Sequence, residues 1–138
     1  MFLLDASAII TLVREAKEGA PDVLRGRHTI PLAFYEAGNF VWKERVLRKA
    51  ISAQEASVLL DAFTRALNLM VLSPLAIGEL RDIHELAERA GLTFYDAAYL
   101  YVAIRDGLAL VTEDRELAKK ARGLGVRVLS AGELLPEA

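Results

Sequence analysis

Four acidic side chains, spread over the whole chain, have the types and spacing needed to do chemistry together. Asp5 and Asp114 follow short apolar runs, whereas Glu36 and Asp96 lie early in helical patterns. If the apolar runs are parallel strands, their carboxyl ends and the amino ends of the following helices share one edge of a sheet, which is where ligands bind in such folds. The spacing therefore predicts that four carboxylates gather at one sheet edge.

Carboxylates gathered in this way repel one another and raise each other's pKa unless a cation compensates. Hard oxygen ligands suit Mg²⁺ or Mn²⁺. The chain has no cysteine and two histidines, which excludes thiolate sites and a cysteine nucleophile and disfavours a histidine-rich zinc site. A divalent-metal site made of carboxylates is typical of phosphoryl transfer and phosphodiester hydrolysis.

Neutral polar residues accompany three of the four acids. Ser7 is two residues after Asp5, Thr112 is two residues before Asp114, and Asn39 is one helical turn after Glu36. Hydroxyl and amide groups at these places are expected to hold the carboxylates in orientation. Asn39 is the most informative of the three, because asparagine inside a helix lowers stability unless it has a partner.

Each acid also has an ordinary structural explanation. Asp5 fits an N-cap, Asp96 fits the third residue of a capping box begun by Thr93, and Asp114 fits a first helical turn, where the helix dipole favours an anion. Local capping by Ser7 and Thr112 is an equally good interpretation of those hydroxyls. Capping is the favoured explanation for any one acid alone, whereas the four acids taken together favour a shared site.

The elements that must position the acids alternate along the chain. Short apolar runs predict strands, and apolar residues at a period of 3.6 predict helices. Strands are expected at residues 2–4, 29–31, 69–72, 108–111 and 126–129, and helices at 6–15, 32–49, 52–67, 74–90, 93–107, 112–122 and 131–135, with a break at 19–22 followed by one more helical turn at 23–25. Alternating strands and helices predict an α/β fold with a parallel sheet covered on both faces.

Length and composition agree with one domain spanning residues 1–138. The hydrophobic fraction of 54% exceeds the usual range, and a buried subunit interface is the expected explanation. The chain contains no uninterrupted apolar stretch of about 18 residues and no basic segment at its start, so neither a membrane span nor a signal peptide is expected. We therefore expect a cytoplasmic protein.

Four segments of the chain resemble, in order and in spacing, the successive motifs of the PIN-domain nucleases. The segments are Phe2-Leu3-Leu4-Asp5-Ala6-Ser7, Tyr35-Glu36-Ala37-Gly38-Asn39, Thr93-Phe94-Tyr95-Asp96-Ala97-Ala98-Tyr99 and Leu110-Val111-Thr112-Glu113-Asp114. The resemblance covers essentially the whole chain. It is strongest to the small single-domain toxins of the VapBC toxin–antitoxin type.

The resemblance implies a three-layer α/β/α fold with a central five-stranded parallel sheet, and a metal-dependent endoribonuclease that uses Mg²⁺ or Mn²⁺. Carried over by motif, the acidic quartet of catalytic and metal-binding residues is Asp5, Glu36, Asp96 and Asp114, with Ser7, Asn39 and Thr112 as supporting residues. Asp5 and Asp96 are expected to be direct ligands. Glu36 is expected to bind the metal or to act as a base through water, and Asp114 to bind it through water.

Because the net charge is −2, contacts to an RNA substrate must come from local basic patches. The candidates are Arg14, Lys43, Arg45 and Arg115, although solvated helix ends are the favoured explanation for most of these charges. The central helix at 93–107 is apolar around most of its circumference and is expected to face a second subunit as well as the sheet. The resemblance further implies a homodimer and a cognate antitoxin that blocks the acidic site with a basic side chain.

Three other classes of protein are alternatives to a metal-dependent nuclease. A phospho-acceptor receiver domain needs an adjacent acidic pair after the first strand, and Leu3-Leu4-Asp5 lacks one. A phosphatase with an Asp-x-Asp nucleophile motif is disfavoured because Ser7 stands where the second aspartate belongs. The remaining alternative is a non-catalytic RNA- or protein-binding PIN-like domain that keeps the acids for folding.

Overall fold

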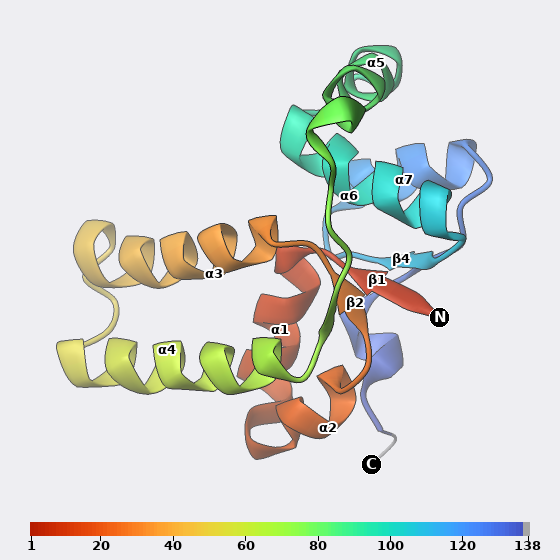
Figure 1. Cartoon of the computed structure of the whole chain (residues 1–138). Helices are drawn as coiled ribbons and strands as arrows, with labels where there is room; N and C mark the ends of the chain where they lie inside the picture. The colour runs from red at the N-terminus through yellow and green to blue at the C-terminus, as the bar shows by residue number, and fades with distance from the viewer. Residues whose placement is uncertain (137–138) are drawn as a thin grey trace.

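The computed structural model describes residues 1–136 and contains a five-stranded parallel sheet with the strand order β3-β2-β1-β4-β5 (Figure 1). The strands are β1 (Phe2–Leu4), β2 (His28–Thr29), β3 (Val71–Leu72), β4 (Ala109–Val111) and β5 (Val128–Leu129). The chain builds outward from β1 to β3 and then returns to place β4 on the other side of β1. The strand order therefore reverses between β1 and β4, which is the position where parallel α/β sheets bind ligands.

Helices cover both faces of the sheet, so the predicted three-layer architecture is confirmed. Helices α1 (Ala6–Ala16), α2 (Ala20–Leu24), α3 (Leu32–Trp42) and α4 (Ala53–Asn68) share one apolar core, and α5 (Leu80–Ala90), α6 (Phe94–Asp106) and α7 (Arg115–Gly123) share the other. Successive strand residues supply the two cores, because side chains alternate across a sheet. Leu3 and Leu110 belong to the core of α5–α7, and Leu4 and Val111 to the core of α1–α4.

Several helix ends follow directly from the local sequence. Ser52 and Glu55 form the predicted capping box at the start of α4, with both hydrogen bonds 3.0 Å long. The Thr93 hydroxyl accepts a hydrogen bond from the backbone N–H of Asp96 and so caps α6. Gly91 and Gly107 end α5 and α6 with φ values of 68° and 66°, a conformation that favours glycine.

The break predicted at residues 19–22 is wrong in its extent, because the helical turn predicted at 23–25 begins at Ala20. A 3₁₀ turn at Lys17–Gly19 leads directly into α2, which includes Pro21 in its first turn. Proline is tolerated there because the first N–H groups of a helix have no partner within it. The predicted tail helix is likewise a 3₁₀ turn, Ala131–Leu134. The predicted extent of the domain also includes residues 137 and 138, which lie outside the described residues.

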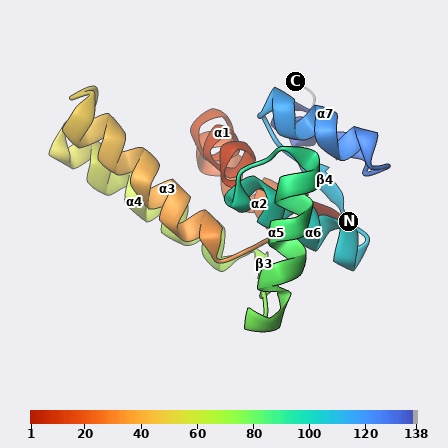
Figure 2. The same ribbon diagram turned by 90° about the horizontal axis from the view of Figure 1, so that it is seen from above.

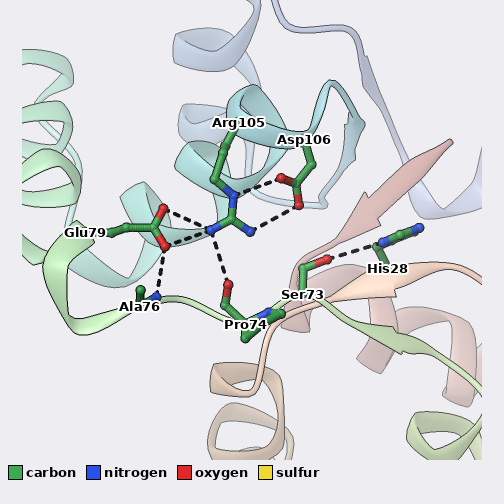
Figure 3. Close-up of polar contacts among 7 residues, drawn as sticks. All are labelled: His28, Ser73, Pro74, Ala76, Glu79, Arg105 and Asp106. Atoms are coloured by element: carbon green, nitrogen blue, oxygen red, sulfur yellow. Dashed lines mark hydrogen bonds and ion pairs between the residues drawn. The ribbon is translucent and has the colours of Figure 1, made fainter.

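The segment from residue 69 to 79 also differs from its prediction. Strand β3 is two residues long and exposed because it lies at the edge of the sheet. Ser73 and Pro74 do not start a helix: α5 begins only at Leu80, after a 3₁₀ turn at Ile77–Glu79. Arg105 holds this segment in place by donating hydrogen bonds to the Pro74 carbonyl and to Glu79, while also pairing with Asp106 (Figure 3).

Helices α3 and α4 run side by side and extend away from the rest of the molecule (Figures 1 and 2). Helix α3 continues through a π-helical turn, Lys43–Leu47, to the end of this arm. Helix α6, in contrast, lies at the centre of its layer, and six of its side chains are buried within the subunit, leaving Tyr95 and Ile104 as its exposed large apolar side chains. Within residues 1–136, none of the helices is long and apolar enough to cross a membrane.

Candidate metal-binding acidic site

Asp5 is the most firmly held acid of the predicted quartet. It directly follows β1, is 3% exposed, and caps α1 by accepting a hydrogen bond from the backbone N–H of Ala8 at 3.0 Å. The Ser7 hydroxyl donates to Asp5 Oδ1 at 2.6 Å, and the Thr112 hydroxyl donates to Asp5 Oδ2 at 2.5 Å. Strands β1 and β4 are neighbours, which is why residues 5 and 112 meet although they are far apart in the sequence.

These bonds determine which oxygen of Asp5 is available to a ligand. Oδ1 accepts two hydrogen bonds and Oδ2 accepts one, so one lone pair of Oδ2 remains free. Burial raises the pKa of Asp5 to about 6, since the low dielectric disfavours the charged form. The hydroxyls of Ser7 and Thr112 and the Ala8 N–H oppose this rise, and the charge of Asp96 adds to it.

The two hydroxyls also connect Asp5 to the start of α7. Ser7 Oγ accepts a hydrogen bond from the backbone N–H of Glu113, and Thr112 Oγ1 accepts one from the backbone N–H of Asp114, both at 3.0 Å. Each hydroxyl therefore gives its proton to Asp5 and uses its oxygen to hold the loop after β4. The predicted supporting contacts of Ser7 and Thr112 are present in the structure.

Glu36 is held by Tyr99, a residue that was not predicted to belong to the site. The hydroxyl of Tyr99 donates to Glu36 Oε1 at 2.8 Å, and this links α6 to α3 across the site. Tyr99 is 1% exposed, and its pKa is raised well above the ordinary value by burial and then by the charge of Glu36. A sequence signal existed: Tyr99 stands three residues after Asp96, so the two share a helix face.

Asp96 and Asp114 lie close enough to the other acids for their charges to interact. Burial raises the pKa of Asp96, and the charges of Asp114 and Glu36 raise it further. The Thr93 cap uses the backbone N–H of Asp96 and not its carboxylate. Asp114 caps α7 by accepting from the backbone N–H of Leu117, so for Asp5 and Asp114 the capping interpretation and the acidic-site interpretation hold together.

The donor set suits a hard divalent cation, although the four acids do not form a closed cage. Within the described residues, no group of three or more His, Asp or Glu side chains is positioned to hold a metal ion by itself. Mg²⁺ is usually bound through one or two carboxylates and several waters, and it does not require such a cage. The free lone pair on Asp5 and the uncompensated repulsion among the acids therefore fit a Mg²⁺ or Mn²⁺ ion.

Asn39 does not support Glu36 as predicted, because its side chain is exposed and Tyr99 makes the contact to Glu36. The predicted basic residues are spread out as well. Arg14 lies over the ring of Phe40, 5.5 Å from its centroid, while Lys43 and Arg45 lie along the α3–α4 arm. Arg115 differs from them, because it lines a cavity of about 270 Å³ together with Thr112 and Asp114.

A parallel sheet with acidic side chains at its strand-order reversal defines the class of α/β domain that binds ligands at that edge. Comparison with known proteins gives the family: residues 2–123 match the PIN domain, and the chain belongs to that family.

Two relatives come from Pyrobaculum aerophilum. Exonuclease VapC9 is 38% identical over 128 residues, which cover 88% of this chain and 86% of the relative. Ribonuclease VapC3 is 36% identical over 126 residues, which cover 86% of this chain and 92% of the relative. The crystal structure of PAE2754 from the same organism matches with a TM-score of 0.76 and 32% identity, over 96% of this chain and 90% of that one.

Proposed function

We propose that this PIN-domain protein is a Mg²⁺- or Mn²⁺-dependent endoribonuclease and the toxin of a toxin–antitoxin pair. The observation that carries the proposal is the arrangement of Asp5, which is held by Ser7 and Thr112 within the field of Asp96. The names of the two relatives, a ribonuclease and an exonuclease, support the same class of reaction.

Asp5 Oδ2 and Asp96 are the proposed direct ligands, with Glu36 and Asp114 acting at longer range. When bound there, the cation supplies a Lewis acid that activates water and neutralises charge on the reacting phosphate. Ser7 and Thr112 fix the Asp5 carboxylate and reduce its freedom to rotate. Tyr99 leaves Glu36 Oε2 free to accept a proton from water, because its hydroxyl occupies Oε1.

Arg115 and Lys43 are the basic residues best placed to guide an RNA substrate to the acids. Arg115 borders the cavity beside Asp114 and can neutralise a phosphate next to the acids. Lys43 is seven residues after Glu36, which places both on one side of α3, about 10 Å apart along the helix. Arg14 and Arg45 remain weaker proposals, because Arg14 already packs on Phe40 and Arg45 lies half a turn away from Glu36.

We further propose a homodimer, a cytoplasmic location and a cognate antitoxin. The support for the antitoxin is the VapC name of both relatives and a site whose negative charges a basic side chain would neutralise. The support for the dimer is the pair of exposed apolar side chains Ile77 and Leu80. Leu80 also lines a cavity of about 620 Å³, together with Phe94 and the charged or polar side chains Arg81, His84, Glu85 and Glu88. Two copies that bury this surface would account for the high apolar content.

The proposal is tested by incubating purified protein with a mixed-sequence single-stranded RNA, with and without Mg²⁺ or Mn²⁺, and comparing the wild type with Asp96→Asn. We expect metal-dependent cleavage that falls at least about a hundredfold in the variant, because the substitution keeps the shape and removes the charge. Asp61→Asn, an exposed acid on α4, is the matched control and should cleave normally. Circular dichroism checks that both variants fold.

A covalently closed RNA circle of the same sequence separates endonuclease from exonuclease action, since a circle offers no end. Linearisation of the circle supports the endonuclease proposal, and degradation of the linear RNA alone supports an exonuclease. Metal-independent binding without any cleavage would instead favour the non-catalytic RNA-binding alternative. Full activity of Asp96→Asn would rule out the proposed ligand role of Asp96.

A further inference from the structure

Tyr95 is an exposed aromatic residue next to Asp96 in the sequence, and none of the contacts described above uses it. Its side chain is 60% exposed, although it stands in the first turn of α6, directly before Asp96. Single exposed rings are ordinary on protein surfaces. What distinguishes Tyr95 is its position relative to Tyr99 and Glu36.

The helix geometry determines the side on which Tyr95 lies. Tyr95 and Tyr99 are four residues apart, so they share one face of α6, and the hydroxyl of Tyr99 reaches Glu36 on that face. Side chains on a helix lean toward its amino end, and α6 begins at the carboxyl edge of the sheet. Tyr95 therefore lies one turn further out than the Tyr99–Glu36 bond, on the solvent side of the acids.

The backbone under Tyr95 is fixed, which gives the ring a defined place. Thr93 caps α6 through the N–H of Asp96, and the residues that follow Asp96 are buried against the sheet and α5. A rigid aromatic ring loses little entropy when a partner packs on it. The ring thus provides a preorganised apolar surface beside a site that handles phosphates.

Tyr35, like Tyr95, stands directly before one of the acids, but its side chain points in a different direction. It stands directly before Glu36 on α3 and is 75% exposed. Ala33, Ala37 and Val41 form the buried side of α3, and Tyr35 is about 200° around the helix from Ala37. Its ring therefore points away from the core and does not stand over the acids, which makes Tyr35 a matched control.

We propose that Tyr95 is a stacking platform for one unpaired RNA base next to the bond that is cut. This inference rests on the proposed function, because it takes the acidic site as the place where the RNA backbone lies. Bases in a duplex are stacked on both faces, so only an unpaired base can turn its face to the ring. Tyr95 thereby selects single-stranded segments and loops over duplex RNA.

The test measures coupling between the ring and a base, which means that the contribution of one base to RNA binding depends on the presence of the Tyr95 ring. Binding of fluorescein-labelled single-stranded hexamers is followed by anisotropy in an Asp5→Asn background, in which the proposed reaction is blocked and the RNA stays intact. Each hexamer carries an abasic nucleotide at a different position. The protein forms are Asp5→Asn alone and combined with Tyr95→Ala, Tyr95→Phe or Tyr35→Ala.

We expect that loss of the base at one position weakens binding about tenfold when Tyr95 or Phe is present, and less than twofold after Tyr95→Ala. Tyr35→Ala should leave the coupling unchanged, and a duplex of equal length should bind equally to the proteins with and without the Tyr95 ring. An equal effect of base loss with and without the Tyr95 ring would overturn the proposal. So would a change of oligomeric mass in Tyr95→Ala without a change in coupling, because the ring would then belong to a protein interface.

Failure of this inference is distinguishable from failure of the proposed function. If wild-type protein cleaves RNA with metal but shows no coupling at Tyr95, the nuclease proposal stands and the stacking platform does not. If coupling is present but the wild type never cleaves, the protein binds single-stranded RNA through Tyr95 without catalysis. A mass measurement on Tyr95→Ala completes the comparison.

Discussion

At the scale of single residues, the central feature of the acidic site is the buried carboxyl group of Asp5. Three hydrogen bonds to Asp5 favour its charged form, yet burial outweighs them, so its pKa rises from 3.8 to about 6. The metal-free protein therefore carries an unfavourable charge at neutral pH. A divalent cation at the free lone pair of Oδ2 would offset that charge.

This predicts a specific pH dependence for the metal-free protein. Because the folded pKa of Asp5 exceeds its unfolded value, the contribution of Asp5 to stability is fully present below pH 3.8 and is lost as the pH rises through about 6. A rise in pKa from 3.8 to about 6 corresponds to roughly 3 kcal/mol. In EDTA, urea unfolding should show that wild type loses about this much relative to Asp5→Asn between pH 4 and pH 7.

The comparison with Asp5→Asn isolates Asp5, because Asp96 also has a raised pKa and titrates in both proteins. Asparagine keeps the size of the side chain and cannot ionise. Parallel stability curves for the two proteins over this range of pH would show that Asp5 is not the group responsible. Addition of Mg²⁺ at pH 7 should raise the free energy of unfolding of the wild type more than that of Asp5→Asn.

At the scale of elements, the site is assembled by α6 and α3, which come from opposite sides of the strand-order reversal. Helix α6 contributes Asp96 and Tyr99 to the site, and α3 contributes Glu36. The Tyr99–Glu36 hydrogen bond is the direct contact between these two helices at the acids. Its loss should therefore affect how the acids are aligned as well as how stable the fold is.

Tyr99→Phe tests this link, because it keeps the buried ring and removes the hydroxyl. We expect Mn²⁺ affinity, measured by calorimetry, to fall about tenfold, since a group that orients a ligand has been removed. The free energy of unfolding should fall by about 1.5–3 kcal/mol, the usual effect of losing a hydrogen bond to a charged group.

Tyr101→Phe is the matched control, since Tyr101 lies further along α6 than Tyr99 and its hydroxyl faces Glu79 and not the acids. It should leave Mn²⁺ affinity unchanged. Equal metal affinity in Tyr99→Phe and wild type would mean that Tyr99 serves only the packing of α6.

At the scale of the whole molecule, apolar surface is exposed away from the central helix. The prediction that α6 faces both the sheet and a second subunit is not supported by its contacts, because most of its apolar side chains are already buried within one chain. Most of the other exposed large apolar side chains lie beside α5 and along the α3–α4 arm. Ile77 is 93% exposed and Leu80 is close to it in the chain.

We predict that the protein sediments with twice the 15.1 kDa mass of the chain, and that Ile77→Asp combined with Leu80→Asp reduces it to the mass of one chain. The reason is that an isologous interface places each substituted position on both subunits, which doubles the cost of the buried charges. Leu47→Asp, an equally exposed site on the arm, is the control and should keep the double mass. An unchanged mass in the double variant would place the interface elsewhere.

Local sequence patterns were enough to predict the order of the elements and the four acids of the site. Periodicity and local capping act over a few residues, so the chain alone was enough to predict the five parallel strands, the Ser52 capping box and the glycine ends at Gly91 and Gly107. Residues 73–79 were mispredicted because Arg105, far along the chain, holds them in a non-helical conformation.

The way in which the acids are held depends on tertiary contacts. The contact between Thr112 and Asp5 requires β4 to lie beside β1, and the contact between Tyr99 and Glu36 requires α6 to pack near α3. Such contacts join residues more than 60 positions apart, and their geometry depends on the packing of both cores. For the same physical reason, the raised pKa of Asp5 and the exposure of Tyr95 follow from burial in the fold, which residue types and spacing do not contain.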